Sequence, residues 1–289
     1  MRRKLAWTIP GSTPTVHRLT VQLTTGSALF LRSVSFPKPP TSLLIFGSGA
    51  QAHSHATVFL RLLPTLSTVT FAVRARNDRA TSLIDSLSDT FPGITFALEI
   101  TSTSSGPADL TQVVGEADII VTVTSSTVSL FPSSAVKPGA RLVLVGSYTP
   151  KMREVEDELI KRAGVIVVDS KEACGHEAGE LISAGVTDEG MVEIGKIVSD
   201  QAARESVGRG GDVVIFKSVS RCDELASVGW LIGRSGWVSR TSLSPSWCLT
   251  LRWRRAWGRR SRDTTYDSVH GRASLEPGWR EMRTVRAGL

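Results

Sequence analysis

Apolar and polar positions along residues 42–170 form two patterns that take turns. Residues 43–46 form a short apolar run without alternation, as expected for a parallel strand covered on both faces. Further runs of strand length occupy residues 69–73, 94–100, 118–124, 141–146 and 165–169. Between these runs, apolar residues recur at helical spacing near residues 52–63, 80–87, 110–114 and 155–162. Because strands alternate with helices, the sequence predicts an α/β fold with a doubly wound parallel sheet and helices on both faces.

A glycine turn follows the first strand and runs from Gly47 through Gly49 and Ala50 to Gln51. Gly47 permits a tight exit from the strand, Gly49 lets the backbone approach a diphosphate, and Ala52 is small enough for the next helix to pack near the strand. The N-terminus of that helix presents unpaired N–H groups and a partial positive charge to phosphates. The turn predicts a dinucleotide site; the alternative is an ordinary strand-to-helix turn.

The end of the second strand bears on which dinucleotide is preferred. An acidic residue about 20 residues past the glycines binds the ribose 2′-hydroxyl of NAD, but here Arg74 follows the strand, with Arg76, Asp78 and Arg79 beside it. Guanidinium groups hold phosphate through bidentate, charge-assisted hydrogen bonds. We therefore expect NADP(H) to be preferred, with NAD(H) possible. The alternative is a solvated, basic helix start.

Polar residues close two other strands at the edge that faces the ligand crevice. Thr122, Thr124 and Ser125 end the fourth strand, where hydroxyl groups can reach the nicotinamide ribose or the pyrophosphate. Threonine and serine are also ordinary loop residues, so residue type alone does not decide their role. Asp169 closes the sixth strand and either orients a group or caps the helix that follows.

Charge and cysteine usage narrow the class of protein. The formal net charge of +7 comes from the two ends of the chain, since no acid precedes Asp78 and a second basic excess lies beyond Ser220. The three cysteines lie far apart, which argues against a zinc site or disulfide framework and favours a reducing compartment. No apolar run approaches the ~18 residues of a membrane span. We expect a cytoplasmic protein with neither a metal nor a membrane partner.

Three histidines are candidates for metal ligands but lack the required spacing. His53 and His55 are not four residues apart on one helical face, and we expect them to pack or to face solvent. His176 stands near Cys174 and Glu177, but all three belong to one helical stretch without further ligands. We expect His176 to be structural.

Five stretches of the chain, in this order and spacing, closely resemble the ornithine cyclodeaminase/mu-crystallin family: LLIFGSGAQA, ADIIVTVTSS, KPGARLVLVGSYTPKMREVEDELI, VVDSKEACGHEAGEL and GDVVIFKSV. The resemblance covers about residues 40–219 and implies a Rossmann-type domain for NAD(H) or NADP(H), paired with a substrate domain built from both chain ends. Family members are typically homodimers. Their activities include cyclising deamination of ornithine, reduction of imines and amino-acid dehydrogenation, and some members act mainly as binding proteins.

The resemblance also implies which residues hold the cofactor. Tyr148 stands where ornithine cyclodeaminases carry a catalytic Asp, whereas the pattern GSxxPxxRE at residues 146–154 resembles the mu-crystallin-like branch. The implied function is an NAD(P)H-dependent reductase of cyclic imino acids (ketimines), with its catalytic residues unassigned. By position, the cofactor residues are Gly47, Gly49, Ala50 and Gln51 at the pyrophosphate, Arg74 after the second strand, Thr124 and Ser125 on the nicotinamide side, and Val145 and Gly146 beside the ring.

Both ends depart from the family pattern. Gln22 replaces an arginine expected to bind a substrate carboxylate, and beyond Ser220 the chain is rich in tryptophan and arginine, with no lysine after Lys217. A non-catalytic NADP(H)-binding remnant that lacks its substrate arm is therefore the alternative function, and nucleic-acid binding through the tail is a third. We expect gene-model error or gene decay to have produced both ends.

The predicted organisation has four regions. Residues 1–40 are a remnant of the substrate domain or a leader, which fits either a fragment of a larger domain or an acid-poor mitochondrial import segment. Residues 41–185 are the NAD(P)-binding Rossmann domain, and residues 186–220 return to the incomplete substrate domain. Residues 221–289 form a basic tail that we expect to be disordered. The expected partners are a small imino or amino acid and, where the substrate domain is complete, a second copy of the chain.

Overall fold

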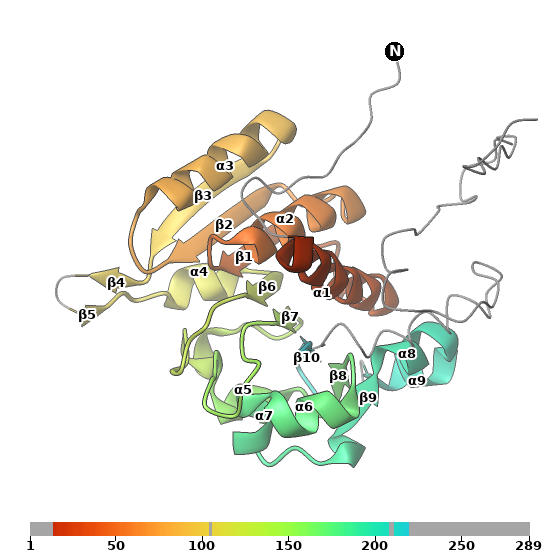
Figure 1. Ribbon diagram of the computed structural model, residues 1–289. Helices are drawn as coiled ribbons and strands as arrows, with labels where there is room; N and C mark the ends of the chain where they lie inside the picture. Colours follow the sequence, from red (N-terminus) through yellow and green to blue (C-terminus); the bar gives the residue numbers. More distant parts are fainter. Residues whose placement is uncertain (1–13, 104–105, 208–210, 220–289) are drawn as a thin grey trace, which may run out of the picture. The chain divides into compact units, whose positions relative to one another are not determined.

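One large parallel sheet organises the fold. The computed structural model describes residues 14–103, 106–207 and 211–219, and its main sheet has eight strands in the order β3-β2-β1-β6-β7-β10-β8-β9 (Figure 1). Every neighbouring pair in this sheet is parallel. The predicted α/β class, with a doubly wound sheet of the Rossmann type, is therefore confirmed. The predicted tail, residues 221–289, lies outside the described residues.

The elements have the following bounds. The main sheet contains β1 (Ser42–Phe46), β2 (Thr68–Val73), β3 (Thr95–Ile100), β6 (Ile119–Thr122), β7 (Arg141–Leu144), β8 (Ile166–Val168), β9 (Met191–Glu193) and β10 (Val214–Lys217). A separate antiparallel pair is formed by β4 (Ser102–Thr103) and β5 (Gly106–Pro107). The α-helices are α1 (Pro14–Ser33), α2 (Ala50–Leu62), α3 (Asp78–Thr90), α4 (Thr111–Glu116), α5 (Asp157–Arg162), α6 (Lys171–Glu177), α7 (Gly179–Ser183), α8 (Ile194–Ser199) and α9 (Gln201–Val207), and the 3₁₀ helices are η1 (Ser133–Ala135) and η2 (Asp188–Gly190). Within the described ranges, no helix is both long enough and apolar enough to cross a bilayer.

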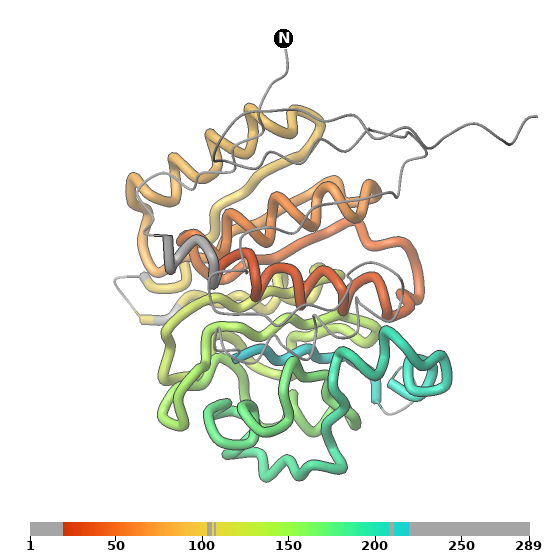
Figure 2. Tube along the Cα trace, turned by 45° about the vertical axis from the view of Figure 1, so that its right-hand side comes forward, coloured from red at the N-terminus to blue at the C-terminus, as the bar shows by residue number. Residues whose placement is uncertain are grey.

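Helices cover both faces of the sheet. On one face, apolar side chains of α1, α2, α3 and α8 pack against strand residues such as Ile45 and Phe71. On the other face, α4, α5, α6 and α7 pack against residues such as Leu44 and Leu142. Figures 1 and 2 both show α1 lying beside α2. Central strands such as β1 and β6 are buried on both faces and show no polar alternation in sequence, whereas β3, at the end of the sheet, alternates exposed with partly buried residues.

The last strand inserts into the middle of the sheet. Phe216 of β10 pairs with Val143 of β7 and with Val167 of β8, so β7 and β8 are not neighbours. The range 186–220, expected to return to a substrate domain, thus contributes both β9 and β10 to the same sheet as β1, and the sheet continues past the predicted domain boundary. The physical reason is the apolar run at residues 213–216, which a strand between two neighbours buries on both faces.

A buried polar cluster joins α1 to α2. His55 is completely buried, with its Nε2 3.0 Å from the hydroxyl of Ser27 and its Nδ1 2.8 Å from the carbonyl oxygen of Gln51. Thr24 on α1 donates a hydrogen bond to Ser54 on α2 over 2.9 Å. Burial lowers the pKa of His55 to about 4, so the imidazole is neutral at pH 7. His55 is a packing residue, and the cluster holds α1 against the helix that follows the glycine turn.

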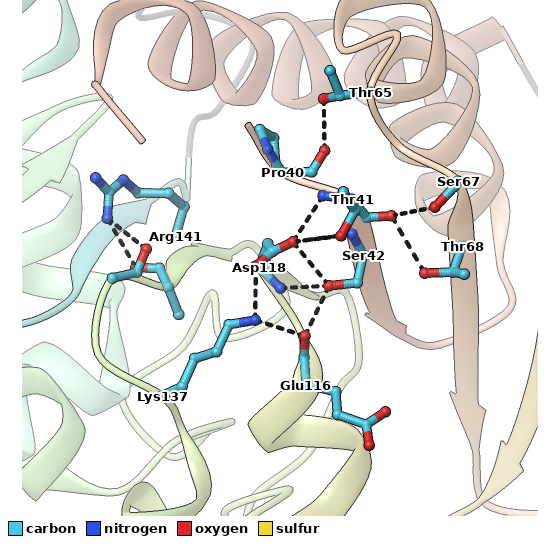
Figure 3. A network of polar contacts seen from close by, with 12 residues as sticks. Pro40, Thr41, Ser42, Thr65, Ser67, Thr68, Glu116, Asp118, Lys137 and Arg141 are labelled. Atoms are coloured by element: carbon cyan, nitrogen blue, oxygen red, sulfur yellow. Dashed lines mark hydrogen bonds and ion pairs between the residues drawn. The ribbon is translucent and has the colours of Figure 1, made fainter. Parts of the chain in front are cut away.

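At the edge where the strands begin, Asp118 ties β6 to the start of β1. Its Oδ2 accepts hydrogen bonds from the backbone N–H groups of Thr41 (2.7 Å) and Ser42 (3.2 Å), and its Oδ1 lies 2.7 Å from Nζ of Lys137 (Figure 3). Burial acts to raise the pKa of Asp118, but these donors and the charge of Lys137 hold it well below its usual range. This network lies at the opposite edge of the sheet from the glycine turn.

Candidate functional site

The residues expected to hold a dinucleotide follow the carboxyl ends of four neighbouring strands. In a parallel sheet these ends share one edge, and a Rossmann-type sheet binds its ligand where the strand order reverses. Here the order runs from β1 to β2 and β3 in one direction and from β1 to β6 and β7 in the other, so the reversal lies between β1 and β6. The residues at these ends are Gly47, Gly49, Ala50 and Gln51 after β1, Arg74 after β2, Thr124 and Ser125 after β6, and Val145 and Gly146 after β7.

Gly47 turns the chain out of β1. Its φ of +121° lies in the region that favours glycine. Its N–H donates to the carbonyl oxygen of Ala72 on β2 over 2.9 Å, and a Cβ here would lie 3.1 Å from Cγ2 of Val123. Conformation and space therefore both require glycine at this position, whether or not a ligand is bound.

Gly49 differs from Gly47 because nothing in the described part of the chain requires it to be glycine. It is the N-cap of α2 with a φ of −87°, and a Cβ built there would meet no atom of the described residues within 4 Å. Among those residues, no side chain caps this end of the helix. An uncapped N-terminus beside an open glycine offers free N–H donors and the positive end of the helix dipole to an anion. These features fit a diphosphate.

Ala50 and Gln51 form the first turn of α2. The side-chain oxygen Oε1 of Gln51 is buried and, within the described part of the chain, accepts no hydrogen bond. A buried amide oxygen without a donor costs about 1–3 kcal/mol, so a ligand hydroxyl or amide that donates to it would be stabilised. Ala52, one residue further, is completely buried and lets α2 pack closely against the sheet.

Arg74 lies directly after β2 and is exposed. Arg76 and Arg79 are exposed as well, and among the described residues the structure gives none of the three an ion pair. Asn77 caps α3, with its Oδ1 accepting a hydrogen bond from the N–H of Ala80. The arginine side chains beside the end of β2 are therefore free to meet an anion.

The hydroxyl of Thr124 already has an acceptor inside the protein. It donates to Oε1 of Glu154 over 2.7 Å, and the hydroxyl of Thr122 donates to Oε2 of the same carboxylate over 2.7 Å. A hydroxyl has a single proton, so Thr124 keeps only acceptor capacity for a ligand. It can accept a hydrogen bond from a ribose hydroxyl but cannot donate one to a phosphate. Of the two contacts expected from the sequence, the ribose therefore fits Thr124 and the pyrophosphate does not. Ser125 is exposed.

Gly146 is required by the packing of the protein itself. A Cβ at this position would lie 1.9 Å from the carbonyl oxygen of Thr124 and 2.3 Å from Oε1 of Glu154. Its N–H donates to Oε2 of Glu154 over 2.8 Å. The preceding residue, Val145, is buried and donates its N–H to the carbonyl oxygen of Thr122 over 2.9 Å. The ends of β6 and β7 are thus packed tightly together.

Lys217 and Glu180 form a buried ion pair that was not predicted from the sequence. The Nζ of Lys217 lies 3.1 Å from Oε1 of Glu180, and both side chains are 0% exposed. Lys217 stands in one row of the sheet with Leu144 and Thr122, at the end of β10. A lysine after the apolar run at residues 213–216 is a sign of a buried charge, but its partner on α7 leaves no sign in the sequence.

Asp169 does not cap the following helix. Ser170 is the N-cap of α6, because its side chain accepts a hydrogen bond from the N–H of Ala173. Asp169 instead accepts hydrogen bonds from the hydroxyl of Ser218 and, over 3.0 Å, from the N–H of Val219. The carboxylate therefore ties the end of β8 to the segment after β10.

The cysteine and histidine near this segment are not arranged around a metal. Cys174 is a buried free thiol whose pKa is raised well above its usual value by burial and by the neighbouring Asp169, while His176 is exposed. Across residues 14–103, 106–207 and 211–219, no three His, Cys, Asp or Glu side chains are grouped so as to hold a metal ion.

Comparison with known proteins decides the family. The sequence model of the ornithine cyclodeaminase/mu-crystallin family matches residues 33–231. The chain belongs to this family. The resemblance stated from five short stretches is thereby confirmed.

Two of the similar proteins are named as imine reductases. The chain is 32% identical over 169 residues to the ketimine reductase mu-crystallin of Rattus norvegicus, a match that covers 58% of this chain and 48% of the relative. It is 39% identical over 118 residues to the delta(1)-pyrroline-2-carboxylate reductase of Bacillus cereus, covering 38% of this chain and 35% of the relative. The chain thus spans half or less of the length of these two relatives.

A solved structure supports the family and the fold. The crystal structure of a probable ornithine cyclodeaminase from Bordetella pertussis Tohama I superposes with a TM-score of 0.60 at 25% sequence identity. The superposition covers 78% of this chain and 70% of that one. The Rossmann-type arrangement of the main sheet is therefore shared with a solved member of the family.

Proposed function

We propose that the protein is an NAD(P)H-dependent reductase of cyclic imino acids. The observation that supports this most is the uncapped N-terminus of α2 beside the open Gly49, placed where the strand order of the sheet reverses. Similarity to a ketimine reductase and to a pyrroline-2-carboxylate reductase supports imines as the substrate class.

The chain's own residues bind and orient the cofactor in this proposal. The N–H groups of Ala50 and Gln51 hold the diphosphate, and Oε1 of Gln51 accepts a hydrogen bond from the dinucleotide. A bound reduced nicotinamide supplies the hydride, and the protein holds it in register with the carbon of the imine. The proposed cofactor residues are those predicted from the sequence, with Thr124 limited to accepting a hydrogen bond from a ribose hydroxyl.

NADP(H) is the cofactor we propose to be preferred. The exposed Arg74 stands at the end of β2, at the place that faces the adenosine ribose in this kind of sheet, and Arg76 lies two residues further. A 2′-phosphate there gains charge-assisted hydrogen bonds from guanidinium groups, which a neutral 2′-hydroxyl does not. NAD(H) is expected to bind more weakly at the same site.

The experiment that tests the function is oxidation of NADPH by the purified full chain in the presence of delta(1)-pyrroline-2-carboxylate. Loss of the reduced-nicotinamide absorbance that depends on both protein and imine supports the reductase. Binding of NADPH without turnover contradicts it, and is the outcome that a non-catalytic remnant predicts. NADH in parallel tests the preference between the two cofactors.

We also infer a homodimer in the cytoplasm. The family resemblance supports the dimer, and a free thiol at Cys174 suits a reducing compartment. Light scattering of the purified chain tests the dimer, and fractionation of cells that express it tests the compartment.

A further inference from the structure

A single buried carboxylate joins the two strand ends on the β6 and β7 side of the site. Oε2 of Glu154 accepts hydrogen bonds from the hydroxyl of Thr122 (2.7 Å) and the N–H of Gly146 (2.8 Å). Oε1 accepts from the N–H (2.8 Å) and the hydroxyl (2.7 Å) of Thr124. Glu154 is completely buried. One side chain therefore fixes the end of β6 relative to the end of β7.

The backbone around Glu154 also binds the loop that follows β6. The carbonyl oxygen of Glu154 accepts a hydrogen bond from the N–H of Leu130 over 2.9 Å, and the N–H of Arg153 donates to the carbonyl oxygen of Ser126 over 3.0 Å. The loop after β6 is thus attached to the Glu154 segment at several points. These backbone hydrogen bonds couple the conformation of the loop to that of the Glu154 segment.

The hydrogen bonds show that Glu154 is held as an acceptor on both oxygens. Every group bonded to its carboxylate is a backbone N–H or a hydroxyl that donates. Burial raises the pKa of Glu154, while the charge of Lys217 and the donors at Thr122 and Thr124 act in the opposite direction. Lys217 is in turn paired with Glu180.

Burying a carboxylate is expensive unless donors surround it, and an apolar side chain would fill the same space at a lower desolvation cost. The carboxylate of Glu154 therefore calls for an explanation beyond packing. Its donors all lie at the carboxyl ends of β6 and β7. A dinucleotide lies across the reversal of strand order, with one mononucleotide half over β1 to β3 and the other over the strands beyond the reversal. The hydrogen bonds of the Glu154 carboxylate all go to residues at the ends of β6 and β7, beyond the reversal.

We propose that Glu154 is a positioning residue for the nicotinamide half of the coenzyme. This inference rests on the proposed function. By holding the ends of β6 and β7 together, Glu154 sets where Thr124, Ser125 and Gly146 meet the nicotinamide half, and it does not contact the groups expected to bind the adenosine half. Loss of the carboxylate weakens binding of the whole coenzyme much more than binding of its adenosine end.

The test compares two probes, NADPH and 2′,5′-ADP, which lacks the nicotinamide half. The variant is Glu154→Gln, which keeps the shape but places an NH₂ donor where the protein supplies donors. We expect the affinity for NADPH to fall about tenfold, the size expected from losing a hydrogen bond to a charged group, with 2′,5′-ADP binding unchanged within about twofold. Titration calorimetry measures both affinities on the full chain.

Glu156→Gln is the matched control. Glu156 lies two residues away, and its Oε2 accepts a hydrogen bond from the N–H of Ser133, away from the ends of β6 and β7. The same chemical change there is expected to leave both affinities within about twofold of the unsubstituted protein. A loss of NADPH affinity confined to E154Q separates the positioning role from a general effect of removing a carboxylate.

Equal losses for the two probes, or an unchanged NADPH affinity in folded E154Q, would overturn the role of Glu154. An unsubstituted chain that binds neither probe would overturn the proposed function itself, and this inference with it. Where E154Q fails to fold, Thr122→Val decides, because it removes one donor and leaves three. It is expected to lower NADPH affinity about threefold and to spare 2′,5′-ADP, and equal effects on the two probes contradict the proposal.

Discussion

The ammonium nitrogen of Lys217 lies 3.1 Å from Oε1 of Glu180, and neither side chain reaches solvent. The pair lies at the end of β10, the strand that enters the sheet out of sequence order. Two opposite charges at this depth stabilise each other mainly because each would be costly alone. Removing either charge is therefore expected to leave the other buried and unpaired, which lowers the stability of the fold.

Lys217→Met tests this dependence. The substitution leaves Glu180 buried without a counter-charge, and we expect it to lower the free energy of unfolding by about 3–5 kcal/mol in urea titrations. The double variant K217M/E180L is expected to be more stable than K217M alone, because an apolar pair of similar volume carries no desolvation cost. A double variant as unstable as the single one contradicts this account.

Gly49 and Gly47 are expected to respond differently to a side chain. Gly49→Ser places a favourable capping residue at the start of α2, where a Cβ meets no atom of the described residues, so stability should be unchanged or rise by roughly a few tenths of a kcal/mol. NADPH affinity should nevertheless fall at least about tenfold, because the side chain occupies the space proposed for the diphosphate.

The contrasting variant, which tests stability rather than binding, is Gly47→Ser. At a φ of +121° and with Val123 close by, a side chain is strained, so this variant should lose about 1–3 kcal/mol of stability even without coenzyme. Thermal unfolding with and without NADPH measures both effects. G49S that binds NADPH normally would show that the diphosphate does not approach this turn.

Arg74→Ser is predicted to change the cofactor preference. Removing the guanidinium after β2 should weaken NADPH binding by about tenfold or more and leave NADH binding within about twofold, since only NADPH carries the 2′-phosphate. Fluorescence titration with the two reduced coenzymes measures the ratio. Arg32→Ser, an exposed change at the end of α1, serves as the control and should affect neither. Parallel losses for both coenzymes would assign Arg74 a different role.

The buried imidazole of His55 is expected to make the folded protein less stable in mild acid. Burial lowers its pKa in the folded protein from 6.5 to about 4, so the unfolded chain binds a proton that the folded one excludes. Its contribution is fully present above pH 6.5 and is lost as the pH falls from 6.5 towards 4, by at most about 3 kcal/mol.

Urea unfolding of the intact protein and of His55→Gln at pH 7 and pH 5 measures this contribution. H55Q should be less stable at pH 7, because it loses a buried cluster that joins α1 to α2, but its stability should change less between the two pH values. His176→Gln, at an exposed position, should retain the pH dependence of the unsubstituted protein. An identical pH dependence in H55Q would show that another group titrates.

Much of the fold could be predicted from local patterns. Apolar runs and helical spacing predicted six strands, β1, β2, β3, β6, β7 and β8, and the helices α2 to α5 to within a few residues, since both periods depend on near neighbours in the chain. The glycine turn was equally local, because a tight exit at Gly47 and an uncapped start of α2 at Gly49 need only adjacent residues. Of the two roles considered for Asp169, capping of the next helix was wrong, because Ser170 beside it is the better-placed cap.

By itself, the sequence determined the α/β class, the family and the candidate cofactor residues after β1 and β2. Only the tertiary structure decided that β10 lies between β7 and β8, that the hydroxyl of Thr124 belongs to Glu154, and that Lys217 is paired with Glu180. The reason is physical: strand order, register and buried charge pairs join residues far apart in the chain, and a residue's type does not show which distant group will satisfy it once water is excluded.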